Sequence, residues 1–67
     1  MLNLKYRRQV KEMSLRDLQI KSGVGHNYIC LAENKRYIPS ERQLLRIATA
    51  LEWEGAPQEL LEEYKED

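Results

Sequence analysis

The chain has 67 residues and a mass of 8.0 kDa, which suffices for one small domain, residues 1–67, but not for a second hydrophobic core. Hydrophobic residues (42%) and charged residues (33%) occur in proportions typical of a globular protein. One Cys and one His can form neither a disulfide framework nor a closed zinc site, so we expect no metal and no cofactor. So short a chain also has little scaffold for a substrate cavity, which argues against an enzyme and a small-molecule substrate.

A membrane-spanning segment is not expected. The longest aliphatic runs, such as residues 29–32, are far shorter than the roughly 20 apolar residues that a transmembrane helix needs. Residues 1–12 carry too many charges for the apolar stretch of a signal peptide. We therefore expect a cytoplasmic protein without a membrane partner.

The net charge of zero conceals an uneven distribution of charge along the chain. Residues 1–37 contain eight Lys or Arg against three Asp or Glu, a net +5, whereas residues 38–67 contain three against eight, a net −5. Such segregation predicts one basic and one acidic face, and a basic face attracts polyanions. Solvated surface charge is the commoner cause of such runs, so the charge pattern alone does not define a partner.

Helices alone are expected, because no stretch alternates with period two and β-branched residues are few. The first predicted helix covers residues 4–13, with Leu4, Val10 and the aliphatic stem of Arg7 along one stripe. It ends before Ser14, which is typical of the N-cap of the next helix.

A capping box predicts where the second helix begins. Ser14 is followed three residues later by Asp17, and each can satisfy the other's free backbone donor. This helix covers residues 15–22 and ends at Gly23, which adopts the left-handed conformation that closes a helix without steric cost.

The third helix follows after a very short connection. Val24 is predicted to be a buried plug, and Gly25 is predicted to cap a helix that runs from residue 26 to residue 33 or 34. Ile29 and Ala32 form its inner stripe.

Two helices of about eight residues joined only by residues 23–25 cannot lie antiparallel, so they must cross steeply. This is the geometry of a helix-turn-helix motif, which would span residues 14–34. In such a motif the first helix lies over the DNA backbone and the second enters the major groove.

The fourth helix is predicted to begin at Pro39 and Ser40, where Ser40 and Gln43 form a second capping box, and to end near Trp53. Its apolar residues have the i, i+3, i+4, i+7 spacing of an amphipathic helix: Leu44, Ile47, Ala48 and Leu51.

Pro57 fits the first position of a fifth helix. The apolar side of that helix carries Leu60, Leu61 and Tyr64.

A set of residues in a fixed order runs through most of the chain. It comprises Ser14, Asp17, Leu18, Gly23, Val24, Tyr28, Ile29, Glu33, Asn34, Arg36, Pro39, Ser40 and the segments 44–48 and 50–51. This set resembles the helix-turn-helix family of Cro and the phage repressors, also called the XRE family, over residues 4–61. The resemblance implies an all-α, compact, five-helix, lambda-repressor-like DNA-binding domain.

The resemblance also implies that Arg8 and Glu33, 25 residues apart, pair and tie the first helix to the end of the third. Arg8 can in addition face a DNA phosphate. The alternative is two unrelated surface charges, and an exposed pair would contribute less than about 1 kcal/mol.

Base-contacting side chains are expected on the third helix. The resemblance places His26 and Asn27 where the family reads base edges; an Asn can bond adenine N6 and N7, and a neutral His can donate or accept once. Leu31 is predicted to point outward, where it can touch a thymine methyl, and Cys30 beside it can do likewise. The alternatives are a solvated helix terminus, an isolated surface leucine and a cysteine that fills a packing gap.

A further set of residues is expected to contact the DNA backbone, which positions a protein without reading sequence. It comprises Arg8, Ser14, Arg16, Lys21, Asn34, Lys35, Arg36 and Arg42. Tyr28 joins this set if its hydroxyl faces a phosphate, although packing of its ring in the core is the favoured interpretation. Each neutralised phosphate releases counterions, so DNA affinity should fall steeply with salt.

Four positions depart from the family pattern. Leu15 stands where a Gln commonly holds a phosphate and braces the next helix, and a leucine does neither. Gln19 replaces a small residue at the crossing of the two helices, which predicts a looser crossing or an outward-pointing side chain. Lys35 replaces a glycine, which predicts that Asn34 becomes the left-handed residue. Gly25 replaces the usual Ser or Thr cap at little cost.

These features predict a sequence-specific transcriptional regulator that binds double-stranded DNA, such as a repressor of phage, plasmid or mobile-element type, and reads the major groove with its third helix. Strong discrimination normally needs two half-sites about 34 Å apart, so we expect a homodimer. The expected interface consists of Trp53, Leu60, Leu61 and Tyr64, unless these residues close the monomer core. The alternative function is an antitoxin-like or protein-interaction module that binds a partner protein through its acidic C-terminal half.

Overall fold

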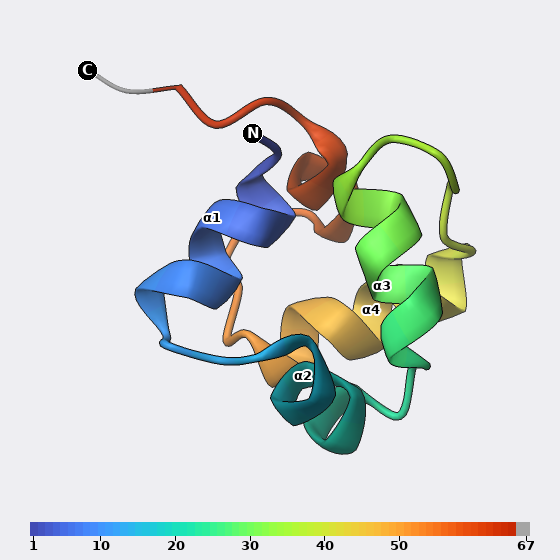
Figure 1. The fold of residues 1–67 in the computed structure, drawn as a ribbon. Coiled ribbons are helices and arrows are strands. Elements are labelled where there is room, and N and C mark those ends of the chain that lie inside the picture. Colours follow the sequence, from blue (N-terminus) through green and yellow to red (C-terminus); the bar gives the residue numbers. More distant parts are fainter. Residues whose placement is uncertain (66–67) are drawn as a thin grey trace.

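Four α-helices and one 3-10 helix make up the fold in the computed structural model, which describes residues 1–65 (Figure 1). In chain order they are α1 (Asn3–Val10), α2 (Leu15–Ser22), α3 (His26–Glu33), α4 (Glu41–Ala50) and η1 (Pro57–Leu61). No strand occurs in these described residues, so the predicted all-α class is confirmed for them. None of the helices described is long and apolar enough to cross a membrane.

The predicted starts of α2 and α4 are confirmed, because both capping boxes are present. Ser14 Oγ accepts a hydrogen bond from the Asp17 backbone N–H at 3.0 Å, and Asp17 Oδ2 accepts one from the Ser14 N–H at 2.9 Å. These bonds stabilise the carboxylate and lower the pKa of Asp17. Ser40 and Gln43 make the same reciprocal pair at 3.1 and 3.0 Å. Gly23 ends α2 in the predicted left-handed conformation, with φ of 77°.

Non-glycine residues in the left-handed conformation follow the other three α-helices. They are Glu12, Lys35 and Glu52, with φ of 56°, 61° and 54°. In each case the next residue donates its backbone N–H to a carbonyl five residues back, as in a Schellman motif. After α1, for example, the Met13 N–H bonds the Arg8 carbonyl oxygen at 3.1 Å.

These turns overturn three predictions. α1 ends at Val10 and α4 ends at Ala50, each about one helical turn before its predicted end. Lys35 rather than Asn34 is the left-handed residue after α3. The predictions placed this conformation only at Gly or Asn, because any other residue adopts it at a cost of roughly 1–2 kcal/mol.

The core lies where α4 packs against α2 and η1, with α1 and α3 closing its sides. Its largest fully buried side chains are Leu4, Leu18, Ile29, Ile47, Leu51 and Leu60. The predicted inner stripe of α4 and the Val24 plug are therefore confirmed. Val10, predicted to face inward, is 51% exposed, because α1 ends at this residue and turns away from the core.

The chain after η1 pairs with the N-terminus instead of continuing as the predicted fifth α-helix (Figure 1). The Asn3 N–H donates to the Glu62 carbonyl oxygen at 2.8 Å, and the Tyr64 N–H donates to the Met1 carbonyl oxygen at 2.8 Å. The Tyr64 ring stacks on Tyr6, with ring centroids 3.6 Å apart. This pairing brings both ends of the described chain to one side of the molecule.

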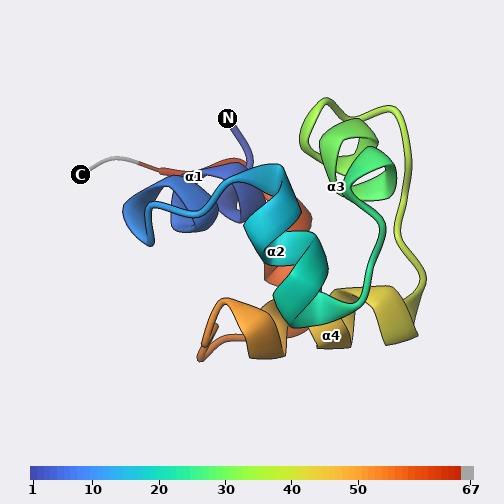
Figure 2. The same ribbon diagram turned by 60° about the horizontal axis from the view of Figure 1, so that its bottom comes forward.

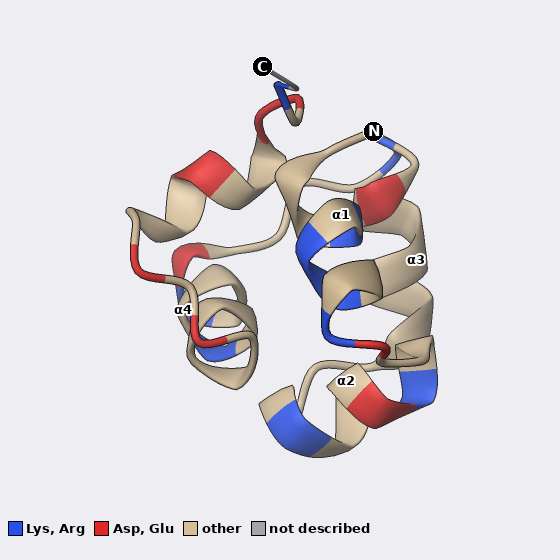
Figure 3. Ribbon diagram, turned by 90° about the vertical axis from the view of Figure 1, so that its left-hand side faces the viewer, with Lys and Arg blue, Asp and Glu red and all other residues tan. Residues whose placement is uncertain are grey.

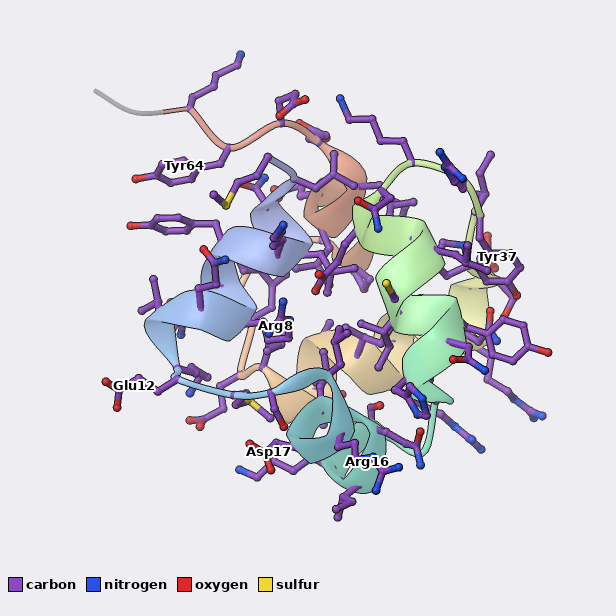
Figure 4. The ribbon with its side chains drawn as sticks, viewed as in Figure 1. Arg8, Glu12, Arg16, Asp17, Tyr37 and Tyr64 are labelled. Carbon is purple, nitrogen blue, oxygen red and sulfur yellow. The ribbon has the colours of Figure 1, made fainter. Side chains whose placement is uncertain are left out.

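Replacing Glu12 by Gly should stabilise the protein. The Glu12 side chain is exposed and makes no ion pair within residues 1–65, so the substitution removes mainly left-handed strain (Figure 4). After allowance for the greater freedom of Gly in the unfolded chain, we expect a gain of about 0.5–1 kcal/mol in urea unfolding. Glu12→Ala, which keeps the Cβ atom, is the matched control and should give no such gain; equal stabilities of the two variants would contradict this account.

Candidate nucleic-acid interface

α2 and α3 are joined by three residues, and their axes cross steeply (Figures 1 and 2). Gly23 closes α2, Val24 is 4% exposed in the core, and Gly25 occupies the N-cap position of α3, as predicted. α2 packs against both α3 and α4. α3 therefore lies at one side of the molecule, held from behind by its neighbours (Figure 2).

α3 has one buried and one exposed side. Ile29, Ala32 and Glu33 face the interior, and each is at most 9% exposed. Asn27 and Leu31, four residues apart on the opposite side, are exposed, Leu31 by 40%. The predicted outward orientation of Leu31 is therefore confirmed.

The other two predicted base-contacting residues, His26 and Cys30, are half-buried beside this exposed side. The Cys30 thiol is free, and the Asn34 side-chain amide approaches its Sγ atom to 3.6 Å. The same amide nitrogen donates to the Cys30 carbonyl oxygen at 2.9 Å, so Asn34 completes the last turn of α3. Cys30 therefore lies partly under a neighbouring side chain.

Gln19 on α2 holds the beginning of α3. Its Oε1 atom accepts the backbone N–H of His26 at 2.7 Å and lies 2.6 Å from His26 Nδ1. The His26 N–H is one of the first-turn donors that have no acceptor within α3, and Gln19 supplies an oxygen for it from the preceding helix. The expectation that Gln19 points outward is wrong, because the side chain is half-buried and contacts α3; the alternative, a looser crossing of the two helices, stays a prediction.

The sequence contains a signal for this contact that the predictions missed. A glycine N-cap has no side-chain acceptor for the first N–H groups of a helix. Gln19 lies four residues before Gly23, so it is on the last turn but one of α2 and its amide oxygen can serve as that acceptor. Leu15 packs against the core, and Gln19 is the α2 side chain that holds the beginning of α3.

The ion pair between Arg8 and Glu33 holds the other end of α3. Arg8 Nε donates to Glu33 Oε2 at 2.7 Å and Nη2 donates to Glu33 Oε1 at 3.1 Å, while Nη1 donates to the Met13 carbonyl oxygen at 2.7 Å. The Arg8 and Glu33 side chains are 13% and 5% exposed, and Arg8 points toward the middle of the fold (Figure 4). The bond to Glu33 raises the pKa of Arg8.

The predicted pairing of Arg8 with Glu33 is thus confirmed. Both side chains are largely shielded from water, so the contribution of the pair is not that of a surface pair. The three hydrogen bonds of Arg8 use three of its five guanidinium N–H groups, so its contact with a phosphate stays a prediction.

Exposed cations lie on and around α2 and α3. Arg16 and Lys21 on α2, Arg36 after α3 and Arg42 on α4 are exposed and make no ion pair among residues 1–65; Arg16 points outward in Figure 4. Lys35 is exposed but bonds the Glu63 carboxylate. Four of the six predicted backbone-contacting cations are therefore available to an anion, and the other two, Arg8 and Lys35, are bound to acids.

The Ser14 hydroxyl serves as the predicted cap of α2, whereas Tyr28 differs from its predicted environment. Tyr28, favoured above as a core residue, is 49% exposed: its ring lies over Gly25 and packs at a tilt on Tyr37, with centroids 5.2 Å apart. The reason is that Ile29 and Ala32 already fill the buried side of α3, which leaves Tyr28 on the flank beside Tyr37.

The basic and acidic halves of the chain do not form separate faces. Figure 3 shows Lys and Arg on α1, α2 and α4. Acidic residues lie on α2 as well as in the segment after α4. Two acids of the C-terminal half pair with cations of the N-terminal half: Glu52 with Lys11 at 2.8 Å, and Glu63 with Lys35 and the N-terminal ammonium. These pairs lower the pKa of both carboxyls.

The four residues predicted to form a dimer interface serve mainly the monomer. Leu60 is fully buried in the core, so its prediction as an interface residue is wrong. Trp53 packs against the core and donates its indole N–H to the Ala56 carbonyl oxygen at 3.0 Å. Leu61 is half-buried, and Tyr64 is half-buried against Tyr6.

The most exposed of the large apolar side chains lie outside this predicted interface. Ile20, Ile38 and Leu45 are 79%, 84% and 60% exposed, and they come from α2, the loop after α3, and α4. Nothing in the sequence predicted that these three residues would lie on the surface.

Comparison of the chain with models of protein families, with curated proteins and with solved structures finds no significant match.

Removing one member of the Arg8–Glu33 pair should be far more damaging than removing both. Arg8→Met leaves the Glu33 carboxylate buried without its partner, and we expect the free energy of unfolding to fall by about 3 kcal/mol or more. The double variant Arg8→Met/Glu33→Leu should recover most of this loss in urea unfolding. Lys11→Met, which breaks an exposed pair, is the control and should have a much smaller effect. A double variant no more stable than Arg8→Met would contradict the account.

Proposed function

We propose that the protein is a sequence-specific regulator of transcription that binds double-stranded DNA. α2, the turn 23–25 and α3 act as a helix-turn-helix motif, within a lambda-repressor-like domain in which η1 takes the place of a fifth α-helix. α3 enters the major groove, which is wide enough for one helix. The protein has no enzymatic role in this proposal, and it acts in the cytoplasm as a repressor of phage, plasmid or mobile-element type.

The observation that carries the proposal is that α3 is fixed at both ends while its outer side is exposed. Gln19 holds its first residue and Arg8 holds its last, so the helix cannot rock against the body of the protein. Asn27 and Leu31 face solvent between these two anchors. A helix held in this way presents base-reading side chains without a further loss of conformational freedom on binding.

The exposed cations support the same proposal. Arg16 and Lys21 on α2 and Arg36 after α3 lie on or next to the helix-turn-helix and make no competing ion pairs within residues 1–65. In a helix-turn-helix complex such positions contact phosphates, which orient the protein and make binding salt-dependent. Lys35 joins them once it leaves Glu63.

The proposal includes a homodimer, because one eight-residue helix contacts few base pairs and two half-sites give the needed discrimination. The alternative, an antitoxin-like module that binds a partner through its acidic half, is less well supported. Glu52 and Glu63 of that half already pair with cations of the same chain, which reduces the free acidic surface.

Selection of bound sequences from a random duplex pool at two salt concentrations tests the proposal. We expect one enriched motif, and we expect His26→Ala/Asn27→Ala to abolish the enrichment while leaving non-specific affinity within a few-fold. Arg16→Ala/Arg36→Ala should instead weaken binding to all sequences and reduce the slope of log affinity against log salt by about 2, one for each lost phosphate contact.

Lys65→Ala serves as the matched control, because Lys65 is an exposed cation in the C-terminal segment, outside the helix-turn-helix. Its salt slope should equal that of the parent protein. The proposal is wrong if no motif is enriched, or if the His26→Ala/Asn27→Ala variant selects the parental motif.

A further inference from the structure

The contacts of Gln19 Oε1 determine which nitrogen of His26 carries the proton. A backbone N–H can only donate, so the Gln19 atom 2.7 Å from the His26 amide nitrogen is the carbonyl oxygen. The same oxygen lies 2.6 Å from His26 Nδ1. An amide oxygen has no hydrogen to give, so this contact is a hydrogen bond only if Nδ1 carries the proton.

The other ring nitrogen, Nε2, is then unprotonated in the neutral imidazole and can only accept a hydrogen bond. No hydrogen bond to Nε2 forms within residues 1–65. Every buried side-chain nitrogen or oxygen in that part of the chain has a partner, so Nε2 is in contact with solvent. His26 therefore presents a bare acceptor at the first turn of α3.

Base edges in the major groove differ in what they offer such an acceptor. Cytosine presents its N4 amino group and adenine its N6 amino group, whereas guanine presents only the acceptors N7 and O6, and thymine presents the acceptor O4 and a methyl group. We propose that His26 selects a base with an exocyclic amino group, adenine or cytosine, at the base pair that it reads, and that Gln19 imposes this selectivity. This inference rests on the proposed function and specifies the DNA that the site takes.

Gln19 is a positioning residue in this proposal, because it acts only through the imidazole. A histidine without such a fixed partner can carry its proton on either nitrogen. Its Nε2 atom can then donate to guanine N7 or O6 as readily as it can accept from an amino group. The oxygen of Gln19 removes that choice by fixing the proton on Nδ1. It also fixes the ring, since the same oxygen holds the backbone of the same residue.

The experiment uses the whole protein and the duplex motif that it enriches, at about pH 8 so that the neutral ring is compared throughout. The base pair read by His26 is the one whose preference disappears in His26→Ala and persists in Asn27→Ala. Every base pair carries one such amino group, on its adenine or its cytosine, so affinities are measured for all four base pairs at that position. We expect the two pairs with the amino group on the strand that faces His26 to be preferred over the two reversed pairs by about tenfold, the usual order for one hydrogen bond whose loss leaves an acceptor unpaired.

Base analogues isolate the group that is recognised. Purine in place of adenine, or pyrimidin-2-one in place of cytosine, removes the amino group alone and should cost the same factor in the parent protein but nothing in His26→Ala. Replacement of guanine by 7-deazaguanine at that position should have no effect. A preference that does not follow the strand position of the amino group, or an amino-group preference that survives His26→Ala, would overturn the inference.

Gln19→Met keeps the length of the side chain and removes its oxygen. We expect this variant to lose the discrimination between adenine or cytosine and guanine while retaining salt-dependent binding to DNA. Nitrogen NMR of the parent protein gives an independent reading, because it distinguishes a protonated Nδ1 from a protonated Nε2 without DNA. A proton on Nε2 would overturn the inference even if Gln19→Met failed to fold.

The two proposals fail in different ways. If no duplex is bound selectively, the proposed function fails, and the choice of base fails with it. If a motif is bound through His26 but removal of the amino group of that base pair costs no affinity, the proposed function stands and this inference alone is wrong.

Discussion

The buried ion pair between Arg8 and Glu33 is the contact on which the rest of the structure depends. It joins α1 to the end of α3, and the third guanidinium nitrogen binds the Met13 carbonyl oxygen in the loop before α2. One side chain thus ties together three segments that no covalent staple connects. Because both charges are largely shielded from water, loss of either partner leaves the other charge without compensation, which is costly for the stability of the fold.

The two anchors of α3 differ in chemistry and in consequence. Arg8 fixes the C-terminal end through charge, at a site largely shielded from water. Gln19 fixes the N-terminal end through one neutral oxygen that also orients His26, at the edge of the exposed side. The first anchor therefore governs stability and the second governs the proposed readout. One side chain at each end, Gln19 and Arg8, is enough to hold α3 in this small domain.

The sequence predicted what depends on local chemistry and missed what depends on neighbours distant along the chain. The Ser14–Asp17 capping box and the buried stripe of α4 follow from short spacings, and both are present. The turn at Glu12 was missed, because tertiary packing holds a non-glycine residue in a conformation that its own preferences oppose. Gln19 was misread because its role exists only once α2 and α3 cross, and Tyr28 because the buried side of α3 was already full.

The central claim is that the outer side of α3 is a preformed surface for a DNA groove. Titration of the isotopically labelled protein with its enriched duplex, followed residue by residue by NMR, tests it most directly. The account predicts that the largest shifts fall on His26, Asn27 and Leu31, while the Arg8 side-chain signals keep their free-state positions because the anchor does not move. Shifts concentrated in residues 52–64, or loss of the Arg8–Glu33 contact on binding, would contradict it.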